Sequence, residues 1–186
     1  MVRRMTLVAI ALLSVSLVVG CGGKLSQKPV NESDVPDFVL NPPKQKGVLY
    51  GTGLSEQRSM QLAKETADLR ARKEIATILS SKVSTMIKDY LGQAGIGTEA
   101  EVTELTQSVT RSISELELTG VTIERREYKN NKMYSLAKLS LDNSMKDLIT
   151  KAVNSSFSSK EALLSQFRAK QGFEELDKQL EKMKEE

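Results

Sequence analysis

The sequence predicts an α+β fold in which three short strands accompany several amphipathic helices. From about residue 56 to residue 91, apolar residues recur at steps of three and four, which is the spacing of one helical face. Residues 47–54, 121–128 and 133–141 are short runs with many apolar and β-branched residues near glycine or asparagine, which indicates strands. With 186 residues, the chain is long enough for one such domain with its own core.

The long helix over residues 56–91 changes character along its apolar face. Its first half carries Ala63, Ala67 and Ala71 at a spacing of four. Because small side chains on one face let a helix lie close to a sheet, we expect this half to pack on the strands. Larger apolar residues follow where the helix would extend beyond the sheet or meet another helix: Ile75, Ile78, Leu79, Val83, Met86 and Tyr90.

A second helix is expected directly after the glycine-rich segment 92–97, which ends the first helix. Thr98 and Glu101 have the spacing of a capping box, in which each side chain binds the backbone N–H of the other residue. The apolar stripe of this helix is formed by Val102, Leu105, Val109, Ile113 and Leu116. The short connection predicts an antiparallel helical hairpin.

The second and third strands flank Asn130 and Asn131, a residue type that tolerates left-handed backbone angles. A three-residue loop would place five apolar residues of these strands on one face, whereas a two-residue loop would divide them between both faces. These residues are Val121, Ile123, Ala137, Leu139 and Leu141. Because a buried face resists such division, we predict the three-residue loop.

The C-terminal part predicts two further helices separated by a polar break at residues 154–156. Asp142 would cap the first, which carries Met145, Leu148, Ile149 and Ala152, and Ser158 with Glu161 would open the last. The last helix has an apolar stripe spaced three, four and three, as in a coiled-coil seam: Phe173, Leu176, Leu180 and Met183. This stripe predicts either a partner surface or a helix packed on its own domain, and both interpretations are open.

The N-terminus predicts a bacterial lipoprotein. Arg3 and Arg4 precede an uncharged apolar run over residues 5–20, which is shorter than the roughly 20 residues of a transmembrane helix and therefore indicates a cleaved signal peptide. The run ends in Val-Val-Gly before Cys21, which resembles a lipobox. Cys21 is the only cysteine, so no intramolecular disulfide can use it. We expect Cys21 to be lipidated and to become the mature N-terminus.

The residues after Cys21 predict an outer-membrane anchor followed by a tether. In enterobacterial lipoproteins, which this N-terminus resembles, aspartate after the cysteine favours inner-membrane retention, and Gly22 stands here instead. Phe38 lies in a proline-rich segment, residues 36–43, that we expect to be extended and to dock the tether on the domain.

The predicted organisation has four parts. Residues 1–20 are the signal peptide, 21–45 the lipidated N-terminus and tether, 46–153 the α+β domain and 154–186 a C-terminal helix. Removal of the signal peptide leaves 166 residues and takes away two arginines, so the formal charge falls from +3 to +1.

Composition argues against several classes of function. The near-neutral charge with interspersed signs gives no electrostatic footprint for nucleic acid. The chain has no histidine and its one cysteine is committed to lipid, which removes the commonest general base, the commonest transition-metal ligand and any thiol nucleophile. We therefore expect no catalytic residues, no metal site and no cofactor, and we do not expect an enzyme.

Two patterns could mark binding sites, and each has a simpler structural explanation. Gly51-Thr52-Gly53 follows a strand, but Glu56 replaces the third glycine of a dinucleotide-binding loop and would repel phosphate, so a tight turn is favoured. A group of basic residues could bind an anion, although acidic residues are interleaved with them, as on an ordinary solvated face. These are Arg70, Arg72, Lys73, Arg125 and Arg126.

The order of motifs resembles the bacterial family of twenty-kilodalton outer-membrane lipoproteins, which is related to flagellar disk lipoproteins. The motifs are Pro36-Asp37-Phe38 with Asn41-Pro42, Gly51-x-Gly53-x-Ser55, and Ala63, Ala67 and Ala71 leading into Arg72 and Ile75-Ala76. The likeness covers roughly residues 36–141 and the lipobox. Members commonly have tryptophan at the position of Phe38, so an aromatic anchor is kept. The C-terminal helix lies outside the likeness.

The resemblance implies a dodecin-like unit, in which a long helix wraps a small three-stranded antiparallel sheet, here with an added helical hairpin and a C-terminal helix. It implies an outer-membrane, palmitate-bearing structural protein of the cell envelope that faces the periplasm and forms homo-oligomers or binds an envelope protein. Association with the flagellum is one form of this expectation. The alternative is a periplasmic module that binds a small ligand on the concave side of the sheet.

Overall fold

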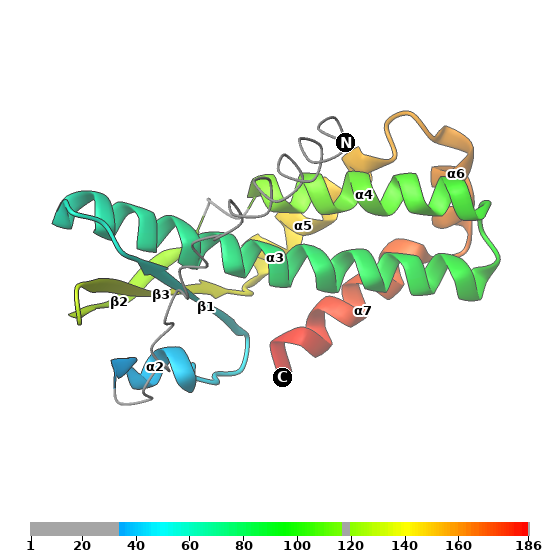
Figure 1. The fold of residues 1–186 in the computed structure, drawn as a ribbon. Coiled ribbons are helices and arrows are strands. Elements are labelled where there is room, and N and C mark those ends of the chain that lie inside the picture. The colour runs from blue at the N-terminus through cyan, green and yellow to red at the C-terminus, as the bar shows by residue number, and fades with distance from the viewer. Residues whose placement is uncertain (1–33, 117–119, 186) are drawn as a thin grey trace, which may run out of the picture. The chain divides into compact units, whose positions relative to one another are not determined.

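A computed structural model describes residues 34–116 and 120–185, and residues Glu32–Glu186 form one compact unit. Its α+β fold has a three-stranded antiparallel sheet in the order β1-β3-β2 and a long helix, as predicted (Figure 1). The strands are β1 (Val48–Ser55), β2 (Thr122–Lys129) and β3 (Lys132–Ser140). The helices are α2 (Asp37–Leu40), α3 (Met60–Ala94), α4 (Glu99–Leu116), α5 (Asn143–Ser156), α6 (Glu161–Ala169) and α7 (Gly172–Glu185).

The first half of α3 packs on one face of the sheet through its alanines, as the spacing predicted. Ala63, Ala67 and Ala71 are at most 1% exposed, and Met133 of β3 packs against the first two. Ser59 caps the helix by accepting a hydrogen bond from the Leu62 N–H at 3.4 Å. The helix thus begins a few residues later than expected, at its capping residue.

The hairpin between β2 and β3 corrects the predicted loop. Asn130 and Asn131 form a two-residue turn with φ values of 50° and 61°, and Lys129 pairs with Lys132. A β-bulge between Ile123 and Arg125 then shifts the register by one residue. The extra residue of the bulge shifts the register as a longer loop would have done, so the five apolar residues still join one core. They are Val121, Ile123, Ala137, Leu139 and Leu141.

The second half of α3 forms a helical bundle with α4, α5 and α7 (Figure 1). The predicted capping box is present, since the Thr98 N–H donates to Glu101 Oε2 at 2.8 Å and the Glu101 N–H to Thr98 Oγ1 at 3.4 Å. Asp142 caps α5 by accepting from the Met145 N–H at 2.9 Å. Within the described residues, no helix is both long and apolar enough to cross a membrane.

The predicted C-terminal helix proves to be two helices, and the predicted polar break at 154–156 lies inside the last turn of α5. Serine and asparagine are tolerated there because the Ser155 and Ser156 hydroxyls donate to the Ala152 carbonyl. The chain turns directly after α5, at residues 157–159, and turns again between α6 and α7, where Gln171 has a φ of 62°. Both helices contribute to the core that α3, α4 and α5 share, within the compact unit that also holds the sheet.

The segment around Phe38 docks on the opposite face of the sheet from α3, as expected, but it is not extended. Residues 37–40 form one helical turn, which fits between Pro36 at the N-cap and the prolines at 42 and 43. Phe38 is 4% exposed and packs against Tyr134 and Leu136 of β3. The Arg125 guanidinium lies 5.0 Å from the centre of the Phe38 ring.

Candidate interaction groove

The predicted lipidation residue Cys21 and the signal peptide lie outside the described residues. The described chain starts at Asp34, which lies beside the tip of the β2–β3 hairpin. The Asn130 amide donates to Asp34 Oδ1 at 2.9 Å, and the Tyr134 hydroxyl donates to the Asp34 carbonyl at 3.4 Å. Asp34, where the described residues begin, therefore lies on the α2 side of the sheet, away from α3.

The Gly51-Thr52-Gly53 motif serves close packing, and the predicted tight turn is wrong because all three residues lie within β1. A Cβ atom on Gly51 would lie 2.5 Å from the Ala71 carbonyl oxygen, and one on Gly53 would lie 2.0 Å from the Ala67 carbonyl oxygen. The glycines are thus the counterpart of the alanines on α3. The backbones of strand and helix approach so closely that neither position has room for a side chain.

The basic residues proposed as an anion site are spread over separate contacts. Arg72 donates to the Val121 carbonyl at 2.6 Å, and Arg70 donates to the Leu54 carbonyl. Arg125 pairs with Glu127 at 3.1 Å. Arg70 and Arg72 tie α3 to β1 and to the residue before β2, and Arg125 pairs within β2, so the structure does not bring these guanidinium groups together around one anion.

Arg126 has the strongest of these contacts, with Asp68 of α3. Its Nε and Nη2 atoms donate to the carboxylate at 2.8 and 2.7 Å, and the buried Ser135 hydroxyl donates to the same carboxylate at 2.7 Å. Burial raises the pKa of Asp68, but the hydrogen bonds from Arg126 and Ser135 outweigh it and the net pKa lies below its ordinary value. This cluster fastens α3 to both β2 and β3.

The free edge of β1 is covered by side chains of α3. Glu74 accepts a hydrogen bond from the Thr52 N–H and another, at 2.9 Å, from the Thr52 hydroxyl. Arg70 donates a hydrogen bond to the Leu54 carbonyl. Such groups block the addition of a further strand. Assembly through this edge of the sheet is therefore disfavoured, which turns attention to the helices.

The apolar stripe of the last predicted helix is covered by the chain's own core. Leu176, Leu180 and Met183 are at most 8% exposed, and Phe173 packs edge-on against Phe167 with ring centres 4.9 Å apart. Of the two open interpretations, the packed helix is the one that the structure shows. A partner cannot be inferred from this stripe as a whole, because three of its four residues are at most 8% exposed and Phe173 is half-buried.

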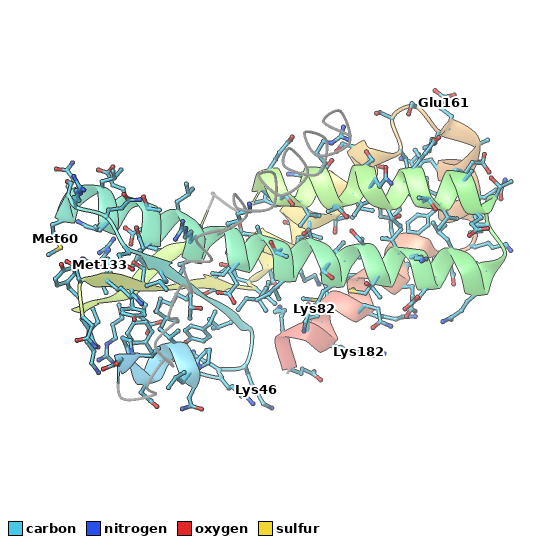
Figure 2. The ribbon with its side chains drawn as sticks, in the orientation of Figure 1. Lys46, Met60, Lys82, Met133, Glu161 and Lys182 are labelled. Carbon is cyan, nitrogen blue, oxygen red and sulfur yellow. The ribbon has the colours of Figure 1, made fainter. Side chains whose placement is uncertain are left out.

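One flank of the α7 stripe leaves a groove against α3, and Met183 belongs to both. We call this the α3–α7 groove and define it by Lys82, Met86 and Asp89 of α3 with Glu175, Gln179, Lys182 and Met183 of α7. Its two hollows share the side chains of Met86 and Gln179. Both Lys82 and Lys182 line this groove, and Figure 2 shows Lys82 between the ribbons of α3 and α7 and Lys182 beside α7.

The α3–α7 groove is apolar along its floor and oppositely charged at its ends. Met86, half-buried, and Met183, buried, form the floor, and such flexible thioether side chains adapt to varied partners. Lys82 and Lys182 line the end nearer the sheet, and Asp89 and Glu175 line the other end. Sequence reasoning missed this groove because Met86 and Met183 looked like ordinary core residues in separate helical stripes.

No group of three or more histidine, cysteine, aspartate or glutamate side chains that could hold a metal ion occurs in the part of the chain that the structure describes. Comparison with protein-family models, with curated proteins and with solved structures found no match for this chain.

Proposed function

We propose that this protein is an outer-membrane-anchored lipoprotein with a structural or assembly role in the cell envelope. The α3–α7 groove supports the assembly role, because a surface groove with an apolar floor and charged ends suits a protein partner. The only cysteine, Cys21, at the end of an uncharged apolar run supports the lipid anchor. Two or more acyl chains are needed for stable attachment, at about 0.8 kcal/mol for each buried methylene.

The alternative of a small-ligand module has less support. It would place the ligand on the concave side of the sheet, one face of which α3 covers. There the α3 backbone comes within 2.0 Å of a Cβ built on Gly53, so strand and helix leave no space between them at that point. The proposal includes no catalysis, since the sequence offers no histidine and no second cysteine.

Lipidation is tested with labelled palmitate in cells that make the wild-type chain or Cys21→Ser. We expect label in the wild type and none in the variant, and we expect the wild type to fractionate with the outer membrane. Equal labelling of the two chains would refute the anchor. Association with the flagellum, the finer form of the proposal, is tested by whether the protein copurifies with isolated basal bodies.

The assembly role is tested separately on the chain from residue 22 onward, which contains the whole compact unit. We expect light scattering to show a mass that rises with protein concentration. A monomer at every concentration, with no envelope protein crosslinked to it in cells, would contradict the assembly role and leave the lipid anchor unaffected.

A further inference from the structure

The first half of α3 carries exposed apolar residues on the side away from the sheet. Leu62 and Leu69 are 49% and 59% exposed and stand seven residues apart, so they lie on one face, opposite the buried alanines. Figure 1 shows that this half of α3 extends past the end of α4. We call Leu62, Glu65, Leu69 and Lys73 the α3 stripe.

The α3 stripe has a charge at each end. Glu65 lies toward the N-terminus of the helix and Lys73 toward its C-terminus, and both are exposed. Eight residues separate them, which is about 12 Å along a helix. Along α3 in the groove, Lys82 and Asp89 are seven residues apart, or about 11 Å.

We propose that the α3 stripe of one copy docks in the α3–α7 groove of a second copy, an inference that rests on the proposed assembly role. With the two α3 helices parallel, Glu65 meets the lysine end of the groove and Lys73 meets the acidic end. Leu62 and Leu69 then cover Met86 and Met183. The α3 stripe and the α3–α7 groove thus match in the order of their charges, in the spacing of those charges and in the apolar residues between them.

Two of the charges in the groove, Lys182 and Asp89, suit this arrangement. Lys182 and Asp89 have no ion-pair partner among the described residues of their own chain, although Glu175 pairs with Lys178 at 3.8 Å. Because stripe and groove are different surfaces, each copy can receive one neighbour and be received by another. A head-to-tail contact of this kind builds a ring or an open chain instead of a closed dimer.

A charge exchange tests the pairing on the chain from residue 22 onward. We expect Lys182→Glu and Glu65→Lys each to raise the concentration at which the chain associates by about tenfold, because each places like charges together. The double variant should associate at a concentration at least about threefold below that of either single variant, since the lysine introduced at position 65 then faces the glutamate introduced at position 182, with Lys82 unchanged beside them. Lys88→Glu, an exposed lysine of α3 outside the groove, is the matched control and should change little.

Cysteine pairing locates the contact directly, because the chain from residue 22 onward has no cysteine of its own. Leu69→Cys and Gln179→Cys chains, mixed in equal amounts and oxidised, should form a disulfide-linked heterodimer. Leu40→Cys is the matched control, because Leu40 is also exposed, at 48%, but lies in α2. It should not crosslink to Gln179→Cys.

The outcomes separate the two proposals. If the wild type never associates, the assembly role itself fails. If it associates but neither the charge reversals nor the cysteine pair distinguish stripe and groove from their controls, assembly stands and this contact is wrong. Circular dichroism of each variant shows that loss of association does not come from loss of the fold.

Discussion

A Cβ atom on Gly53 would lie only 2.0 Å from the carbonyl oxygen of Ala67, which is closer than real Cβ contacts allow. Strand β1 and helix α3 thus meet backbone to backbone where glycine on one side faces alanine on the other. This contact fixes how close the long helix lies to the sheet, and it therefore also positions the second half of α3, which forms one wall of the α3–α7 groove.

Gly53→Ala should destabilise the protein by at least about 1–3 kcal/mol, because the added methyl group meets backbone that cannot move aside without shifting the whole helix. Chemical denaturation measures the effect. Gly92→Ala is the matched control: Gly92 lies in α3 with nothing within 4 Å of its built Cβ, so alanine should stabilise by about 0.5–1 kcal/mol. An unchanged midpoint for Gly53→Ala would show that the packing is looser than described.

The Asp68 cluster should make stability depend on pH. Since the pKa of Asp68 is lowered in the folded protein, its contribution is present above the unfolded-state value of about 3.9 and is lost as pH falls through the folded-state value. Asp68→Asn should cost about 1–3 kcal/mol at pH 7 and much less near pH 2. Asp147→Asn, an exposed carboxylate on α5, should leave the free energy of unfolding nearly unchanged. A cost of Asp68→Asn that stays constant with pH would contradict this assignment.

Phe38 should hold the segment that leads from the compact unit toward the N-terminus. Phe38→Ala removes the buried ring from its contacts with Tyr134 and Leu136, and we expect proteases to cut residues 34–47 several times faster than in the wild type. Leu40→Ala, at an exposed position of the same turn, should not change the rate. Phe38→Trp should keep the segment docked and, in a chain without tryptophan, report docking by its fluorescence. Equal cleavage of the alanine variant and the wild type would mean that the ring is not the anchor.

Removal of α6 and α7 should unfold more than the C-terminus. Phe167, Leu176 and Leu180 belong to the shared core, so a chain that ends at Ser156 should lose its cooperative thermal transition. Leu180→Ala should cost about 2–5 kcal/mol, whereas Lys178→Ala, exposed on the same helix, should change stability by less than about 0.5 kcal/mol. A truncated chain with unchanged stability would restore the idea of a separable C-terminal helix.

Much of the fold followed from local pattern. The four-residue spacing of Ala63, Ala67 and Ala71 predicted the face of α3 that meets the sheet, and Thr98 with Glu101 predicted where α4 begins. These predictions succeeded because helical periodicity and capping involve residues a few positions apart in the chain. The sequence did not predict the turn between α6 and α7, because Gln171 adopts a left-handed conformation there and glutamine is not a residue type typical of that conformation.

The sequence by itself determined which residues are apolar on each element, and with them the α+β class. The anchor at Cys21 stays a prediction from the sequence. Only the tertiary structure decided how those elements meet. The bulge between Ile123 and Arg125, the burial of the stripe on α7 and the α3–α7 groove all depend on partners far away in the chain. Local pattern shows that a face must be covered, but the free energy of covering it depends on which distant surface fits it best, and that is settled only when the whole core packs.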